Sequence, residues 1–517
     1  MALTTAAVVF SIIAAIVTYV VWNVLKQLYL PDSSKPHVVF HWLPLIGSTV
    51  YYGMDPYKFF FECREKYGDC FTFVLLGSPT TVFLGTKGNE FILNGKLKDL
   101  NAEEVYGPLT KPVFGKGVVY DCLNSKLMDQ KRLLGLGLNG DALKSYVPLF
   151  VKEVEDFICK SPVFKSTGGV CDISSIMAEI TIYTAAGSLQ GKELRDKLDG
   201  EVSLLYRDLD DGFAPINFVL PWLPIPRNRR RDRAQKKMAE FYLNVVRGRR
   251  KRDRTTKEQD MLDILMSSRY RSGEPIPDSE VACLMIALLM GGQHNTSSTG
   301  SWIMLRLAHD PPLIEELLQE QLTVLGVSKA SDLPPLTYDH MQNLKLHNQM
   351  VRETLRLHSP IHSVMRKVKT PMPVEGTDWV IPPSHTLLAA PGFLGRTEEN
   401  FPNPQVWDPH RWDDPNAGLP QNAQRDSKED DETIDYGYGA VSLKSIKSPY
   451  LPFGGGRHRC VAEKYAYTQL CAILATMVRL LEWEQVDMSK EVPPTDYSSM
   501  FSRPVHPAET RWKHRGV

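Results

Sequence analysis

The chain has 517 residues, enough for one large catalytic unit, and its 60 lysines and arginines balance 60 aspartates and glutamates. This balance excludes the broad electrostatic attraction by which strongly basic proteins bind nucleic acid, so we expect no nucleic-acid partner. The eight cysteines show neither CxxC pairs nor the regular spacings of zinc sites and disulfide frameworks, which predicts reduced thiols in a domain that faces the cytosol.

The first predicted element is an apolar helix near the N-terminus. No charged residue follows Met1 until Lys26, and residues 6–25 read AAVVFSIIAAIVTYVVWNVL. A helix of about 20 residues rises about 30 Å, the thickness of the hydrocarbon core of a bilayer. The stretch lacks the basic n-region and the cleavage site of a signal peptide, so we favour a retained anchor. Lys26 and Lys35 follow it, and the positive-inside rule then leaves the rest of the chain in the cytosol.

The pattern after the anchor predicts the domain organisation. We divide the chain into a membrane anchor at 1–30, a proline-rich connector at 31–50 and a catalytic domain at 51–517. Two β-like runs, residues 71–76 and 80–84, come before long helical patterns that dominate from about residue 140. The predicted fold class is therefore mainly α with small β-sheets.

Charged runs interrupt the helical patterns. Residues 227–233 (RNRRRDR) and 247–254 (RGRRKRDR) flank a helical stretch at 234–246. We interpret these runs as solvated helix ends and a loop, and contact with anionic lipid is the alternative. The polar, acidic residues 421–432 predict a flexible surface insertion.

A glycine-rich segment carries the strongest chemical signal. Residues 453–460 read FGGGRHRC, and a helical pattern follows over 462–481. Glycines let a backbone approach a large flat ligand closely. Two arginines, a histidine and a helix start beside Cys460 favour its thiolate, which is a good ligand for iron. We therefore predict that Cys460 binds a metal.

This segment resembles the haem-binding loop of the cytochromes P-450, in which a cysteine thiolate ligates haem iron. Further family segments follow the same order along the chain: YGPLTKPVFG at 106–115, ALLMGGQH at 287–294 and ETLR at 353–356. The first of these, with VVYD at 118–121, is similar to the sterol 14α-demethylases and nearest to the fungal lanosterol-type enzymes. The similarity spans roughly residues 38–510 and implies the cytochrome P-450 fold.

The resemblance also implies a role for each matching residue. Haem b is the implied cofactor, with Cys460 as the axial iron ligand. The implied haem-holding residues are Tyr106, Tyr120, Lys131, Arg366, His458, Phe453 and Gly456. The implied sterol pocket is lined by Phe114, Thr110, Phe213, Ile361, His362, Tyr497 and Met500. The oxygen-activating positions are His294, Asn295 and Thr296. A buried structural ion-pair group is implied for Glu353, Arg356 and Arg411.

The implied reaction removes the 14α-methyl group of lanosterol or eburicol in successive oxidations that consume NADPH and O2. The chain has no flavin or nicotinamide fingerprint, so electrons are expected from a separate NADPH-cytochrome reductase flavoprotein. The resemblance further implies the endoplasmic reticulum membrane as the location, and azole-like compounds as inhibitors.

Some positions depart from the family pattern. Asn295 stands at a position where the sterol demethylase pattern has Thr or Ser. A carboxamide does not readily relay a proton. Thr296 lies about 100° further round a regular helix and would substitute only if the helix unwinds locally. Ala462 and Leu123 replace a glycine and a proline of the pattern.

These departures leave several hypotheses open. We favour retained sterol demethylation. The alternatives are a divergent copy that oxidises another triterpenoid in secondary metabolism or gives tolerance to demethylase inhibitors, and a non-catalytic protein that binds haem and sterol.

Overall fold

The computed structural model describes residues 2–198, 200–251, 260–419, 433–442 and 444–516. The α-helices are α1 Ala2–Tyr29, α2 Thr49–Met54, α3 Pro56–Tyr67, α4 Gly85–Leu93, α5 Glu103–Phe114, α6 Asn124–Leu136, α7 Gly140–Lys160, α8 Ile173–Ala185, α9 Lys192–Asp196, α10 Gly200–Asp210, α11 Pro226–Lys251, α12 Met261–Ser267, α13 Asp278–His309, α14 Pro311–Leu325, α15 Tyr338–Asn343, α16 Lys345–Leu357 and α17 Glu463–Leu480. The strands are β1 His37–Val38, β2 Cys70–Leu75, β3 Ser78–Phe83, β4 Leu100–Asn101, β5 Gly168–Asp172, β6 Val364–Val368, β7 Met372–Pro373, β8 Val380–Ile381, β9 Thr386–Ala389, β10 Thr433–Asp435, β11 Ala440–Ser442, β12 Leu481–Gln485, β13 Thr495–Asp496, β14 Arg503–Pro504 and β15 Glu509–His514.

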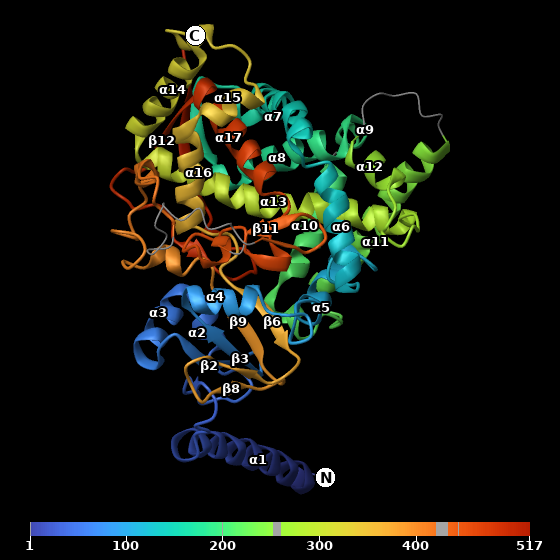
Figure 1. Ribbon diagram of the computed structural model, residues 1–517, viewed down its shortest axis with the longest axis vertical. Helices are drawn as coiled ribbons and strands as arrows, with labels where there is room; N and C mark the ends of the chain where they lie inside the picture. Colours follow the sequence, from blue (N-terminus) through green and yellow to red (C-terminus); the bar gives the residue numbers. More distant parts are fainter. Residues whose placement is uncertain (1, 199, 252–259, 420–432, 443, 517) are drawn as a thin grey trace.

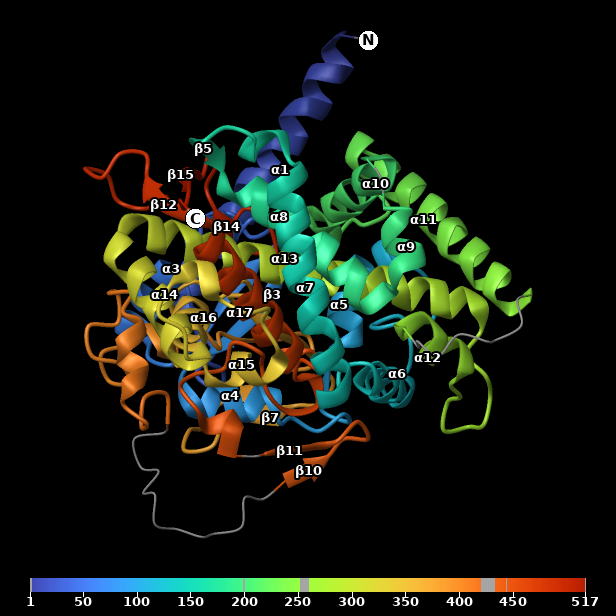
Figure 2. The same ribbon diagram turned by 90° about the horizontal axis from the view of Figure 1, so that it is seen from above.

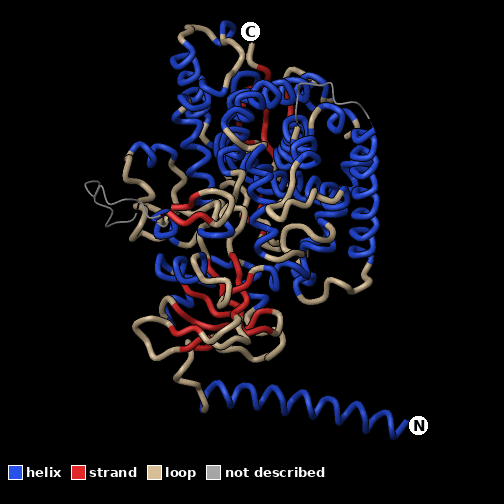
Figure 3. The backbone as a smooth tube through the Cα atoms, turned by 45° about the vertical axis from the view of Figure 1, so that its right-hand side comes forward, coloured by secondary structure: helices blue, strands red, loops and turns tan. Residues whose placement is uncertain are grey.

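A strand-rich part lies between the anchor helix α1 and a larger helical part (Figures 1 and 3). Its main sheet has the order β1-β2-β3-β9-β6-β4. Strand β3 pairs in parallel with β9, and Thr81 lies opposite Leu387. Segments from both halves of the sequence therefore complete one sheet, and the predicted class, mainly helical with small sheets, is confirmed.

Helix α13 runs through the helical part and contacts α8, α11, α16 and α17 (Figure 2). Its buried side chains, among them Met285, Ile286 and Trp302, point in several directions around the helix axis. A helix that is apolar on all sides is stable only when neighbours cover it completely. Within the segment 291–296, Thr296 is buried, residues 292–295 are partly buried and Gly291 is exposed.

Helix α11 is longer than predicted, because it includes the first basic run and the described part of the second. Arg227 and Arg230 each lie 2.9 Å from a carboxylate oxygen of Asp211, and Arg250 lies 2.6 Å from Asp278. These acidic partners neutralise positive charge that would otherwise repel along one helix. Residues 252–254, and the predicted insertion at 421–432, lie outside the described residues.

The N-terminal helix extends beyond the predicted 6–25. Residues 10–29 form a stretch of mean hydropathy 1.5, none of it buried, that is long and apolar enough to cross a membrane. Gln27 Nε2 donates to His41 O at 2.8 Å, and His41 N donates back to Gln27 Oε1 at 3.0 Å. This reciprocal pair attaches the end of the helix to the connector.

Candidate active site

The cysteine loop, residues 453–460, closes on itself before α17 begins. The Cys460 amide donates to the Phe453 carbonyl at 3.0 Å. Gly456 has φ +61°, and a Cβ at this position would lie 2.2 Å from the Leu93 carbonyl oxygen. Only glycine fits this close approach, so the sequence of the loop specifies its shape.

The Cys460 thiol faces an enclosed space. The residue has exposed surface, yet burial raises the pKa of its thiol, against the opposing effects of the Ala462 amide and Lys131. Both observations hold for a side chain that faces an internal space rather than bulk solvent. That the arginines, the histidine and the helix start beside Cys460 favour its thiolate stays a prediction: the Ala462 amide and Arg459 act in that direction, while burial and Glu463 act against it. Arg459 is also paired with Glu463 at 2.5 Å. A bound metal ion would favour the thiolate further.

Cationic and phenolic side chains gather beside this loop. The rings of Tyr106 and Tyr120 are 5.1 Å apart, and Tyr120 lies 5.9 Å from the ring of His458. Arg366 is buried, and its Nη1 donates to its neighbour's backbone, the Met365 carbonyl, at 2.7 Å. Met365 N in turn donates to the Tyr106 hydroxyl at 2.9 Å.

Within the described chain, no carboxylate pairs with the basic residues of this group, Lys131, Arg366 and His458, which we call the cation cluster. Burial lowers the pKa of Lys131 to about 7. Burial, and then the nearby Arg366 and Lys131, hold the pKa of His458 well below its usual range. Buried positive charge is costly without a counter-anion. The donor set therefore fits a flat ligand that carries carboxylates, such as haem with its propionates.

The ion-pair group predicted around Glu353 is assembled. Arg356 binds Glu353 through two hydrogen bonds, of 2.9 and 2.7 Å, and both side chains are completely buried. Arg411 Nε lies 3.4 Å from Glu353 Oε1. The Trp412 indole also donates to Glu353, at 3.0 Å, a contact that the sequence pattern did not indicate. These bonds leave the buried carboxylate fully satisfied, as a costly buried charge requires.

Helix α13 presents a polar segment to open space. A Cβ placed at Gly291 or Gly292 would meet no atom within 4 Å. Asn295, on the same helix face, donates through Nδ2 to the Gly291 carbonyl at 3.1 Å, and its Oδ1 is buried without a partner. The helix stays α-helical through Thr296, which is buried at 4% exposure. The local unwinding that would let Thr296 replace Asn295 is thus absent from this described helix.

His294 contacts an acidic residue that the sequence did not single out. Its Nε2 lies 3.0 Å from Asp210 Oδ1, although the two groups are not aligned as a hydrogen bond. Burial lowers the pKa of His294, and Asp210 opposes that effect. The imidazole stacks on Phe501 at 5.2 Å. Asp210 ends α10 among other acidic residues, so no local signal distinguished it.

The residues predicted to line a sterol pocket fall into two groups. His362, Tyr497 and Met500 line a cavity of about 330 Å³ together with Tyr106. Burial lowers the pKa of His362 to about 4, so this imidazole is neutral.

The second group packs outside the walls of that cavity. The Phe114 and Phe213 rings lie 5.8 Å apart, and Phe213 lies 5.3 Å from Phe501, which forms an aromatic row leading to His294. Thr110 donates to the Tyr106 carbonyl of its own helix, and Ile361 is partly exposed.

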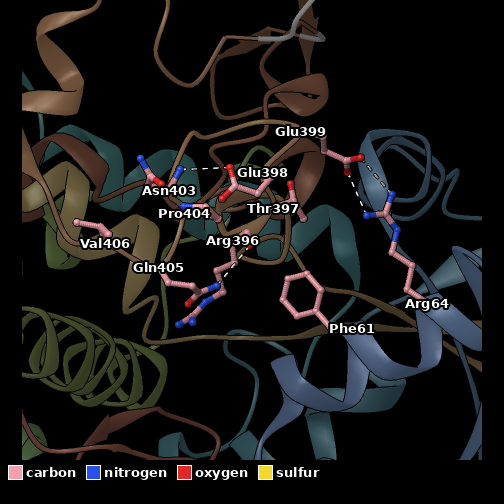
Figure 4. Close-up of a pocket in the computed structure, with 10 residues that line it drawn as sticks. All are labelled: Phe61, Arg64, Arg396, Thr397, Glu398, Glu399, Asn403, Pro404, Gln405 and Val406. Atoms are coloured by element: carbon pink, nitrogen blue, oxygen red, sulfur yellow. Dashed lines mark hydrogen bonds and ion pairs between the residues drawn. The ribbon is translucent and has the colours of Figure 1, made fainter.

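Other cavities differ in character. A polar cavity of about 520 Å³ is lined by several serines with Asp210, Gln293 and His294. A surface groove of about 760 Å³ lies between α3 and the segment 396–406 (Figure 4). There Arg64 pairs with Glu399 at 3.1 Å, and none of the predicted site residues is present. The groove is therefore not the candidate active site.

Comparison with known proteins places these features in context. The family model described as Cytochrome P450 matches residues 36–512. Sterol 14-alpha demethylase CYP51C of Gibberella zeae is 57% identical over 500 residues, which cover 97% of this chain and 95% of that protein. Sterol 14-alpha demethylase cyp51A of Aspergillus fumigatus is 54% identical, covering 97% and 96%. A solved structure, retinoic acid bound cyanobacterial CYP120A1, aligns with a TM-score of 0.74 at 17% identity, covering 94% of this chain and 100% of that one, and shares the fold.

Proposed function

The chain belongs to the cytochrome P450 family, and on that premise we propose that it is a sterol 14α-demethylase, which removes the 14α-methyl group of lanosterol or eburicol. One observation carries the proposal: Tyr106 both lines the 330 Å³ cavity and contacts Tyr120 beside the cation cluster. A lipid-like substrate bound in that cavity would therefore lie next to the cofactor. The high identity to fungal sterol demethylases along almost the whole chain supports this substrate class.

Haem b, when bound, supplies the oxygen activation and draws its electrons from NADPH through a reductase. Cys460 would ligate its iron, and Phe453 and Gly456 would hold the loop in shape. The propionates would supply the anions that the cation cluster lacks. Tyr106, Tyr120 and Arg366 are placed to donate to them.

The cavity residues bind and orient the substrate. Tyr497 and Met500 provide apolar surface, and the neutral His362 adds a polar edge without a charge. A pocket of this kind suits a tetracyclic sterol, because few polar groups are needed to orient its single hydroxyl. Burial of the substrate also excludes water from the reacting carbon.

His294 and Asp210 are the groups best placed to move protons. They contact each other at the inner wall of the polar cavity, which is lined by serines. Asn295 has its amide engaged by Gly291 and offers only the acceptor Oδ1. Asn295 could therefore accept a hydrogen bond but not relay a proton, and the proton would pass through a group that titrates.

The anchor and the partners complete the proposal. Residues 1–30 anchor the chain in the endoplasmic reticulum membrane. Residues 31–50 connect this anchor to the catalytic domain, residues 51–517, which faces the cytosol. An NADPH-cytochrome reductase supplies electrons. Azole-like inhibitors, which are flat heterocycles, fit the open space beside Gly291 and Gly292.

Asn295 favours a second candidate function. If its carboxamide slows proton delivery, the chain acts on another triterpenoid in secondary metabolism, or it binds haem and sterol without turnover and gives tolerance to inhibitors.

The test is a reconstituted assay with the full chain, a fungal-type reductase, NADPH and lanosterol or eburicol, with products identified by mass spectrometry. A 14-demethylated product is expected. Substrate binding without any product, in protein that shows a haem-thiolate carbon monoxide spectrum, would contradict sterol demethylation and favour the second candidate.

A further inference from the structure

A short hairpin covers the cysteine loop from outside. Strands β10 and β11 pair in antiparallel fashion, and the turn between them carries Tyr436 and Tyr438. The hairpin lies at the edge of the molecule in Figure 2, and β11 contacts the segment Gly456–His458 of the loop.

Tyr438 makes two contacts on this face. Its hydroxyl donates to the Gly456 carbonyl at 3.1 Å. The ammonium of Lys131 sits over its ring, 3.6 Å from the centroid, which is a close cation–π contact.

Lys131 also donates hydrogen bonds to the backbone of the same loop. Its Nζ donates to the Arg457 carbonyl at 2.9 Å and to the Arg459 carbonyl at 2.8 Å. An ammonium has three N–H donors, and these two carbonyls use two of them. Besides the propionate contact that the resemblance implies, Lys131 therefore holds the backbone of the cysteine loop.

The turn that carries the tyrosines is itself held in place. Asp435 Oδ1 accepts from the amides of Gly437 and Gly439, at 2.7 and 3.2 Å. Arg271 Nη2 donates to the Gly437 carbonyl at 2.8 Å. Tyr436 lies under the guanidinium of Arg457 at 4.8 Å and its hydroxyl donates to Asn94. These contacts therefore hold the turn between β10 and β11 in place.

We propose that Tyr438 is a positioning residue of the haem site, which with Lys131 clamps the carbonyl oxygens of residues 456, 457 and 459 and thereby orients the peptide groups around Cys460. In a trans peptide the C=O and N–H point in opposite directions. Anchoring these carbonyls outward therefore fixes the directions of the amides that follow them, including that of Cys460. Groups beyond the direct ligand tune the ligation and the reduction potential of a metal site. The inference rests on the proposed function in one respect, because it takes Cys460 as the haem ligand.

The experiment compares full-length variants loaded with haem. In Tyr438→Leu we expect haem to dissociate about tenfold faster and the reduced carbon monoxide spectrum to lose thiolate character. We also expect the reduction potential to shift at temperatures where circular dichroism shows an intact fold. Tyr438→Phe keeps the ring over Lys131 but loses the bond to the Gly456 carbonyl, so it should recover only part of the loss. Tyr67→Leu is the matched control, since it removes a ring that lies beside Lys66, far along the chain from the cysteine loop.

A double-mutant cycle separates positioning from general stability. In a Lys131→Met background, Tyr438→Leu should have a smaller effect than in the unmodified chain, because no ammonium remains to be held and only the bond to the Gly456 carbonyl is lost. Equal haem loss in Tyr438→Leu and the unmodified chain, or additive effects in the cycle, would overturn the proposal. If Tyr438→Leu does not fold, Tyr438→Phe decides instead: because it removes the bond to the Gly456 carbonyl, it must lose haem faster than the unmodified chain, and an unchanged rate would overturn the proposal. An unmodified chain that lacks a thiolate spectrum overturns both this inference and the haem assignment. A thiolate spectrum without demethylation overturns only the proposed function.

Discussion

The two sides of the candidate site differ in how completely their polar groups are bonded. On the cysteine side, Lys131 donates to two loop carbonyls and lies over the Tyr438 ring, and the buried Glu353 is bound by Arg356, Arg411 and Trp412. On the α13 side, Asn295 Oδ1 has no partner within the described chain, and His294 only approaches Asp210. In a network whose polar groups are all hydrogen-bonded, a substitution leaves a buried group without its partner. A polar atom that has no partner does not impose this constraint. A substitution such as Asn295 is therefore easier to accommodate on the α13 side than a change in the ion-pair group around Glu353.

The largest effect is expected when Cys460, the proposed iron ligand on the cysteine side, is replaced. Cys460→Ala should abolish the haem-thiolate spectrum and all turnover, because no other side chain of the described loop offers a thiolate. The reduced carbon monoxide spectrum measures the effect. Cys471→Ala, a change at another buried thiol, is the control and should leave the spectrum intact. A thiolate spectrum in Cys460→Ala would end the assignment.

The buried ion-pair group around Glu353 should lose stability when one of its members is replaced. Glu353→Gln leaves Arg356 buried without a counter-charge, and we expect a loss of about 3–5 kcal/mol in the free energy of unfolding. Chemical denaturation, or the yield of folded protein, measures it. Asp156→Asn breaks an exposed pair with Lys152 and should have little effect. Similar losses in both variants would contradict the assignment of Glu353 to a buried structural pair.

The α13 side should instead respond in activity. Asn295→Thr introduces a hydroxyl that relays protons, so we expect the product formed per NADPH consumed to rise several-fold while stability changes little. Thr296→Val is the matched control. Because Thr296 is buried on another face of a regular helix, its hydroxyl should not affect coupling. A fall in coupling in Thr296→Val would show that the helix unwinds during turnover.

The smallest effect concerns the pH dependence of stability. His362 has a folded pKa of about 4 because it is buried. The unfolded chain therefore binds more protons than the folded chain between about pH 4 and the usual histidine pKa of about 6.5. The stabilisation is complete above that window and is lost as the pH falls through it, by about 1 kcal/mol between pH 7 and 5.5. His362→Phe should flatten this dependence in denaturation curves, and an unchanged slope would contradict the burial of a neutral imidazole.

The sequence by itself determined the elements whose cause is local. The glycines of residues 453–460 specify a tight loop because Gly454 and Gly456 adopt positive φ angles, a conformation that glycine favours. The long apolar pattern around residues 281–308 required a buried helix, and the ExxR spacing put Glu353 and Arg356 one turn apart. The apolar N-terminal stretch likewise read as a helix long enough to span a membrane.

Only the tertiary structure decided which distant groups meet. Asp210 contacts His294, and Tyr438 contacts Lys131, although neither pair is close in sequence. The pKa of Cys460 also depended on burial, which the neighbouring arginines and histidine in the sequence did not reveal. Local patterns report the conformational preferences of a few residues. Desolvation and long-range contacts arise only when the chain packs, because they depend on every element that surrounds the site.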